Sequence, residues 1–252
     1  MSVTGELSNP VVVAFPLRGE GWVAVTSPAD RIPSHGTNLL GQRFAFDFLR
    51  VDDRPRQHYH RAGWLRTLLI GVPTRETYAW GAPVHAPCDG EVVRAADGLA
   101  ERARVHPVRE AFLAVKTALT FNPSRVPAIL GNHVFLRTGD VVAVFAHLAP
   151  GSVAVTEGQL VRAGDVIGRV GHTGNSTSPH LHFQLMDSVD PTVANGVPCA
   201  FASYEVLRDG AWHVVSNGIP GRKDRIRALE PKPTSSASSS SAHEDRTTSA
   251  RR

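Results

Sequence analysis

The chain alternates apolar and polar residues in short runs, a pattern that is typical of β-strands. Strands are predicted in its first fifth at residues 11–15, 21–25 and 44–49. Successive side chains of a strand point to opposite faces. The three phenylalanines of the last strand, Phe44, Phe46 and Phe48, would therefore share a core face. Asp47 would lie on the other face.

Short strands continue after residue 80, where glycines separate them. They are predicted at residues 132–136, 141–147, 153–160 and 161–170, with a hairpin at 202–207 and 212–215. One helix is predicted at residues 107–119, because apolar residues recur there at helical spacing and Pro107 suits a first turn. The polar stretches at about 51–78 and 99–128 are predicted insertions, the first one irregular. The second would pack against the domain or form a lid.

The length and composition predict a single folded domain with extensions. A chain of 252 residues with 42% hydrophobic content can bury one full-sized core. We expect an N-terminal strand extension (1–20), a β domain (21–220) that carries the two insertions, and a disordered tail (221–252). The tail is basic and rich in serine, and it has too few apolar residues to order itself.

Charge and targeting signals constrain the partners only loosely. The net charge of +4 permits attraction to an anionic polymer such as a cell-wall glycan, but no nucleic-acid partner is expected. The first residues lack the basic and apolar regions of a signal peptide, and no apolar run approaches the length of a membrane span. From the sequence alone we therefore expect a soluble, cytoplasmic chain, with a monomer favoured.

The two cysteines, Cys88 and Cys199, are far apart in the sequence. A thiolate zinc site or a redox motif is therefore not expected. One disulfide and two separate core thiols both remain open.

The sequence His180-Leu181-His182 carries the clearest chemistry. In a strand the two imidazoles would lie side by side on one face, while Leu181 and Phe183 point into a core. Histidine is the commonest metal ligand, so this face could hold a metal ion. The other ligands must come from elsewhere in the chain.

An ordered set of motifs surrounds this pair of histidines. In chain order they are Ser34-His35-Gly36 with the later Asp47, Ala86-Pro87-Cys88-Asp89-Gly90-Glu91-Val92, Gly131-Asn132-His133-Val134, Phe145-Ala146-His147-Leu148, Gly164-Asp165-Val166-Ile167-Gly168, and Thr173-Gly174-Asn175-Ser176 before His180-Leu181-His182-Phe183. This order resembles the lysostaphin-type (LytM-like) zinc metallopeptidases, which include peptidoglycan endopeptidases. The resemblance runs from about residue 21 to residue 186, and its last third is the most specific part.

The resemblance implies a fold, a cofactor and a set of site residues. The fold would be an antiparallel β-sandwich of the duplicated hybrid type with a helical insertion. One Zn²⁺ per chain would be bound by His35, Asp47 and His182, which leaves the fourth tetrahedral position for water. His147 and His180 would serve as general base and as stabiliser of the oxyanion, in an order left open. The implied activity is hydrolysis of peptide bonds, with peptidoglycan peptides as substrate and the cell envelope as location.

The sequence departs from the family pattern at one point and leaves alternative functions open. In the better-known members three residues separate the first histidine ligand from the aspartate, whereas His35 and Asp47 are much further apart here. His58, His60 and His85 are therefore considered as substitutes for His35. The alternative function is a non-catalytic relative that binds cell wall or activates a hydrolase. A biotinyl- or lipoyl-type carrier is disfavoured, because no lysine lies between Lys116 and Lys223. We expect ordinary surface or turn roles for the neighbouring His133 and His172.

Overall fold

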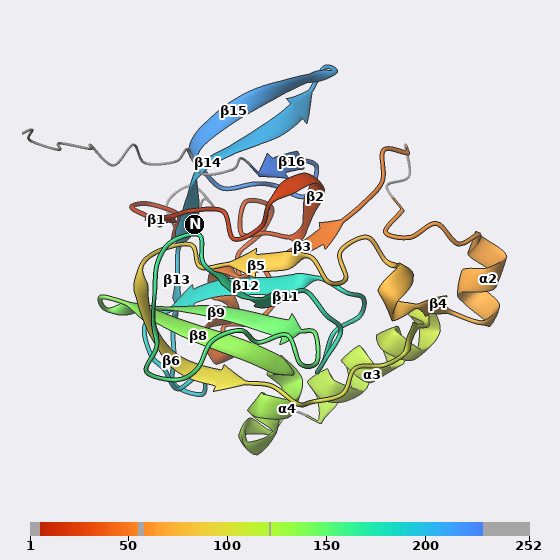
Figure 1. The fold of residues 1–252 in the computed structure, drawn as a ribbon, viewed down its shortest axis with the longest axis horizontal. Helices are drawn as coiled ribbons and strands as arrows, with labels where there is room; N and C mark the ends of the chain where they lie inside the picture. Colours follow the sequence, from red (N-terminus) through yellow and green to blue (C-terminus); the bar gives the residue numbers. More distant parts are fainter. Residues whose placement is uncertain (1–5, 55–57, 121, 229–252) are drawn as a thin grey trace, which may run out of the picture.

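The computed structural model describes residues 6–54, 58–120 and 122–228, and this part of the chain is mainly β with a few short helices (Figure 1). Most strands join one sheet of twelve. Its order is β1 (Val11–Val13), β14 (Cys199–Arg208), β16 (Arg225–Ala228), β2 (Gly19–Thr26), β3 (Phe46–Arg50), β12 (Leu181–Met186), β9 (Val141–Leu148), β8 (Asn132–Thr138), β6 (Gly90–Ala96) and β10 (Leu160–Val161). Two further strands pair at its side, β13 (Gly196–Val197) with β12 and β15 (Ala211–Gly218) with β14. Neighbouring strands are antiparallel except β1 and β14.

Two small ribbons complete the β-structure. Strand β11 (Val166–Arg169) pairs with β5 (Pro83–His85), and β4 (Val72–Pro73) pairs with β7 (Arg104–Val105). The β11–β5 ribbon contributes Val84 and Ile167 to the same buried cluster as the large sheet. The predicted strand series over residues 153–170 is thus reduced to β10 and β11, with turns between them. The core is therefore enclosed by the twelve-stranded sheet together with a ribbon of only two strands.

An aromatic core fixes the orientation of the central strands. Phe46 of β3 stands 5.2 Å from Phe201 of β14 between ring centroids, and Phe183 of β12 stands 5.8 Å from the same ring. Phe145 of β9 lies 5.4 Å from Phe183. All four rings are fully buried. Because side chains alternate along each strand, this packing turns the intervening polar residues of β3 and β12 toward the opposite face, as predicted for Asp47.

Among the described residues, the α-helices lie in or at the end of the two insertions. They are α2 (Trp64–Leu69), α3 (Pro107–Leu119) and α4 (Val126–Leu130), accompanied by the 3₁₀ turns η2 (Thr74–Glu76) and η3 (Pro123–Arg125). A further 3₁₀ turn, η1 (Leu39–Phe44), precedes both insertions. The predicted bounds of α3 are confirmed. Its apolar residues Phe112 and Leu119 are 66% and 82% exposed, whereas Glu110 is buried. The segment 51–78, expected to be irregular, contains α2, β4 and η2.

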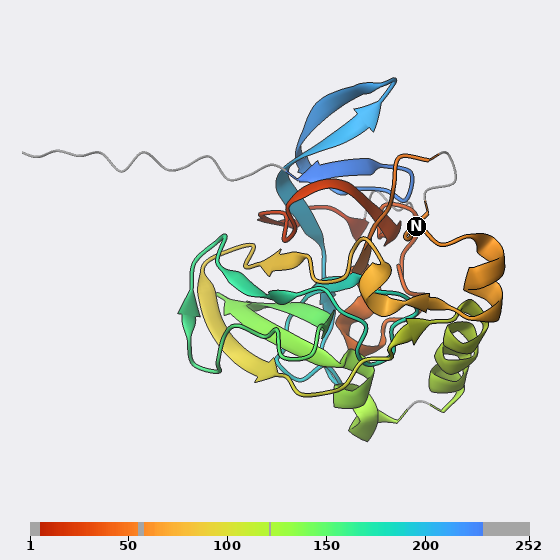
Figure 2. The same ribbon diagram turned by 45° about the vertical axis from the view of Figure 1, so that its right-hand side comes forward.

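Figures 1 and 2 show α2 and α3 together on one side of the sheet. Among the described residues, no helix is both long enough and apolar enough to cross a bilayer.

The structure of the C-terminal region corrects the predicted start of the disordered tail. The predicted hairpin is confirmed, with Leu207 opposite Trp212 and Arg208 opposite Ala211 in β14 and β15. Disorder from residue 221 is wrong for β16, which pairs with both β2 and β14. The rest of the predicted tail, residues 229–252, lies outside the described residues. Cys88 and Cys199 are both free thiols.

The aromatic core predicts a large stability loss for Phe183→Ala. Removing a fully buried phenylalanine ring leaves a cavity and should lower the free energy of unfolding by about 3–5 kcal/mol. Urea unfolding followed by fluorescence measures the loss. The control Val214→Ala removes a side chain that is 62% exposed and should change stability by less than about 0.5 kcal/mol. Equal losses in the two variants would contradict this description of the core.

Candidate metal centre

The pairing of β3 with β12 places two polar side chains opposite each other. His182 is directly across from Asp47 in the antiparallel register, between the buried pairs Leu181–Phe48 and Phe183–Phe46. Side chains in such positions are near neighbours on one face of a sheet. His182 Nδ1 lies 2.9 Å from Asp47 Oδ1.

His35 reaches the same carboxylate from a loop. The chain between His35 and Asp47 turns back through η1, and the Ser34 N–H donates to the Arg43 carbonyl over 2.9 Å. This bond closes the loop next to His35, so the long spacing in the sequence does not keep the two residues apart. His35 Nε2 lies 3.0 Å from Asp47 Oδ2.

The partner of His182 fixes which ring nitrogen carries the proton. His182 Nε2 lies 2.9 Å from Gln184 Oε1, two residues along β12 on the same face. The amide nitrogen of Gln184 donates to the Leu40 carbonyl over 2.7 Å, so Oε1 is the end that faces His182 and can only accept. In the neutral ring the proton is therefore on Nε2. The lone pair of Nδ1 then faces Asp47.

His35 follows the same logic with a different partner. Its Nδ1 lies 3.2 Å from Ser34 Oγ, and that hydroxyl donates its proton to the Gln42 carbonyl over 3.2 Å. The hydroxyl oxygen is left to accept from Nδ1, so the lone pair of Nε2 faces Asp47. Such hydrogen bonds on the far nitrogen are the usual way in which a metal-binding histidine is oriented.

Three electron-rich atoms thus converge on one point. The ligand atoms of His35, Asp47 and His182 all lie within 4.8 Å of one another. Lone pairs that face a carboxylate oxygen at about 3 Å repel it unless a cation lies between them. Burial would raise the pKa of the Asp47 carboxyl, but its interactions with the His35, His180 and His182 rings hold it well below its ordinary range. Two neutral imidazoles and one carboxylate form a donor set that fits zinc.

Two further histidines line the same space. His147 adopts a positive φ of 63° near the end of β9, and its Nδ1 donates to the Thr173 carbonyl over 2.9 Å. His180 donates through Nδ1 to the Ser178 carbonyl over 2.7 Å, and its Nε2 lies 3.3 Å from Asp47 Oδ1. The two rings are 4.9 Å apart between centroids. The backbone bonds therefore leave Nε2 of both rings directed into this space, where that of His180 faces the Asp47 carboxylate.

The surroundings of these two rings differ electrostatically. Burial, reinforced by His180 and His182, holds the pKa of His147 well below its ordinary value. Burial acts in the same direction on His180, but the adjacent Asp47 carboxylate raises the pKa of this ring. A small cavity of about 170 Å³ is lined by all five residues His35, Asp47, His147, His180 and His182.

The other histidines considered in the sequence lie elsewhere. His60 forms an isolated bridge with Thr77, and the Nδ1 of His85 is bonded to the Gly164 carbonyl. In the described part of the chain, neither of them nor His58 joins the cluster around Asp47. Surface or turn roles are expected from the sequence for His133 and His172. A surface position is wrong for both, because both are buried.

A network that the sequence did not predict connects the second insertion to the site. The Arg102 guanidinium donates to the carbonyls of Gly174 and Ser176, and its Nε lies 2.9 Å from the buried Glu110 carboxylate. The Ser176 hydroxyl contacts both His172 Nδ1 at 2.9 Å and His180 Nδ1 at 3.2 Å. Arg102 is 74 residues from Ser176, so no local pattern indicates this contact. Gln184 could have been found, because it shares a strand face with His182.

The family model that matches this chain is described as Peptidase family M23, over residues 76–194. The match includes His147, His180 and His182, whereas His35 and Asp47 precede it. Curated relatives match over a shorter stretch. The DD-carboxypeptidase/endopeptidase Mpg of Neisseria meningitidis serogroup B is 51% identical over 79 residues, and that of Neisseria gonorrhoeae is 49% identical. The stretch is 31% of this chain but only 17% of the length of each relative.

Solved structures of similar proteins share less of the sequence. The catalytic domain of lysostaphin from Staphylococcus simulans is 24% identical, and the alignment covers 54% of this chain and 94% of that domain with a TM-score of 0.31. LytU is 25% identical, with 46% and 62% of the two chains covered and a TM-score of 0.31. The family match and the sequence identity to the Neisseria proteins agree with the resemblance that the order of the motifs indicates. Residues 76–194 of the chain are therefore a match to peptidase family M23, the lysostaphin-type (LytM-like) peptidases.

Proposed function

We propose that this chain is a zinc metalloendopeptidase that cleaves peptide crosslinks of peptidoglycan. The observation that carries the proposal is the convergence of His35 Nε2 and His182 Nδ1 on the Asp47 carboxylate. Members of the family typically use zinc, and the three residues form a candidate site for one ion. When bound, zinc supplies a Lewis acid that polarises a peptide carbonyl and makes water nucleophilic near neutral pH.

The two remaining histidines would move the protons. Each is held by an Nδ1–H bond to a backbone carbonyl, so each ring presents Nε2 toward the cavity in a fixed orientation. One of His147 and His180 would accept the proton of the attacking water, and the other would donate a hydrogen bond to the oxyanion as the carbonyl becomes tetrahedral. The proton then passes to the departing amine.

The substrate class comes from the family and from its relatives. The Neisseria proteins are described as carboxypeptidases and endopeptidases, but this chain matches only 17% of their length, so their activities support the proposal without defining it. The proposal includes the fold type of the resemblance, a duplicated hybrid β-sandwich with the β11–β5 ribbon as its short layer. The retained pair His147 and His180 favours catalysis over a wall-binding or hydrolase-activating role.

Substitutions should separate metal binding from proton transfer. His182→Ala should abolish both zinc retention and hydrolysis, because one of three ligands is lost. His180→Ala and His147→Ala should keep most of the zinc and lose hydrolysis by at least about 100-fold. Zinc content by mass spectrometry and digestion of purified peptidoglycan measure the two effects. Equal zinc loss in all three variants would contradict this division of roles.

Gln184 should act through the orientation of His182. Gln184→Met keeps a similar volume but removes the acceptor for Nε2–H, and loss of such an outer partner typically weakens metal affinity about 10–100-fold. A competitive chelator titration measures the affinity, and urea unfolding checks that the variant is folded. Gln159→Met, at an exposed turn, is the matched control. Unchanged zinc affinity in the folded Gln184 variant would show that this bond does not orient the ligand.

The activity itself is tested by release of peptides from purified peptidoglycan, with and without a chelator. We expect new amino termini in the zinc-loaded reaction and none after chelation, with activity restored by added zinc. Release of peptides at the same rate in the chelated protein would exclude a metallopeptidase. Zinc binding without any cleavage would favour the wall-binding alternative.

A further inference from the structure

A second cavity lies beside the metal centre. It has a volume of about 200 Å³, and both Ile129 and Asn175 line it as well as the cavity around Asp47. The remaining lining residues come from α3, from the segment that leads into α4, and from Arg102 and Gly174. A peptide bound at the metal centre could therefore extend into this second cavity without leaving the protein surface.

The charges around this second cavity are all positive. Arg102, Lys116 and Arg125 line it, and no acidic side chain does so among the residues that the structure describes. Arg102 is paired with the buried Glu110, which also pairs with Arg109, and its guanidinium is bonded to the carbonyls of Gly174 and Ser176. It therefore builds the wall of the cavity.

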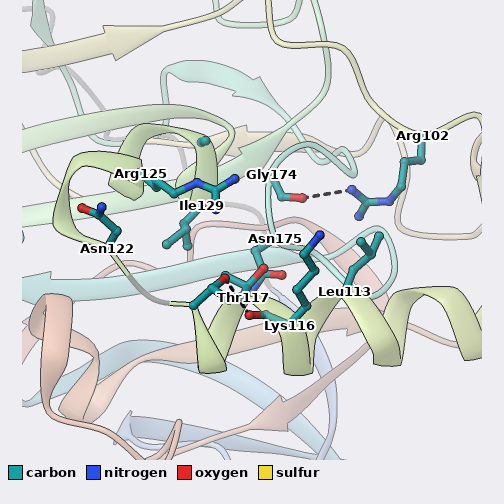
Figure 3. A pocket seen from close by; sticks show the side chains of 11 residues that line it. Arg102, Leu113, Lys116, Thr117, Asn122, Arg125, Ile129, Gly174 and Asn175 are labelled. Carbon is teal, nitrogen blue, oxygen red and sulfur yellow. Dashed lines mark hydrogen bonds between the residues drawn. The ribbon is translucent and has the colours of Figure 1, made fainter.

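Lys116 and Arg125 are different from Arg102. In the described ranges, neither side chain has an ion pair. Figure 3 shows Lys116 rising from α3 and Arg125 entering from the side of α4, with the Gly174–Asn175 turn between them. Both side chains are exposed, so water screens their repulsion in the free protein, and an anionic ligand in the cavity would pair with both charges.

The wall between the two cavities is rigid. Gly174 has a φ of +67°, and a Cβ atom there would lie 2.4 Å from the Ile129 carbonyl oxygen, so only glycine fits. The next N–H, that of Asn175, donates to the same carbonyl over 2.9 Å. This bond holds the backbone of Asn175 at the junction of the two cavities, and Thr117 also lines the second cavity (Figure 3). Both side chains can donate hydrogen bonds to an oxygen anion.

We propose that this cavity is a carboxylate subsite, in which Lys116 and Arg125 hold a carboxylate of the peptide substrate near the scissile bond. Arg binds a carboxylate through two parallel N–H donors and Lys binds it as a point charge, which suits a ligand between the two. The carboxylate can be the C-terminus of the peptide or an acidic side chain. The proposal rests on the proposed peptidase function, because it places the substrate relative to the metal centre.

Binding to the metal-free protein tests the subsite separately from catalysis. With a chelator present, NMR titration compares N-acetyl-triglycine, its C-terminal amide, and an amidated tripeptide with glutamate at its centre. We expect at least one of the two carboxylate peptides to bind about tenfold more tightly than the triglycine amide, and the tighter of them identifies the source of the carboxylate. Binding that does not differ among the three peptides, or no binding by any of them at 10 mM, would overturn the proposal.

Two variants assign the preference to these side chains. Lys116→Gln and Arg125→Gln should each reduce the preference for carboxylate at least threefold, and together they should abolish it. Lys223→Gln is the matched control, because Lys223 is exposed and far along the chain. A full preference in the double variant would also overturn the proposal. Failure of the chain to cleave any peptide would contradict the peptidase function but would leave the binding result intact.

Discussion

The antiparallel register of β3 and β12 is the constraint on which the site depends. It places Asp47 opposite His182, and the buried aromatic rings of the same strands prevent a shift by one residue. Such a shift would turn every side chain of a strand to its other face, so that phenylalanines would point at the cavity and the ligands into the core. The hydrophobic packing of the core therefore fixes the geometry of the polar face, and the stability of the fold and the position of the candidate ligands are linked.

Around Asp47 and His182, hydrogen bonds determine which nitrogen of each neutral histidine ring carries the proton, in addition to orienting the ring. Gln184 and Ser34 accept from the far nitrogens of His182 and His35, while backbone carbonyls accept from His147 and His180. The first two rings are thereby left with lone pairs that face a carboxylate. The other two keep Nε2 at the edge of the same cavity. The four histidines thus form two pairs. His35 and His182 have side-chain acceptors, which agrees with a metal-ligand role, and His147 and His180 have backbone acceptors, which agrees with proton transfer.

The sequence predicted the parts of this site that local periodicity controls. The alternation in β3 and β12 correctly gave the faces of Asp47 and His182, and the helical spacing gave the bounds of α3. The contacts that connect distant segments were not predictable. Arg102 meets Ser176 across 74 residues, and the exposure of Phe112 depends on how the insertion docks. The prediction of disorder from residue 221 was wrong for β16, because this strand is ordered by pairing with β2 and β14. Such pairing with distant strands cannot be predicted from local composition.

The central claim is that His35, Asp47 and His182 bind one zinc ion through the nitrogens that the hydrogen bonds leave free. A crystal structure of the zinc-loaded protein, with anomalous diffraction at the zinc edge, tests it most directly. We expect one peak at about 2.0–2.2 Å from His35 Nε2, His182 Nδ1 and an Asp47 oxygen. A peak bound through His182 Nε2, or one located away from Asp47, would contradict it.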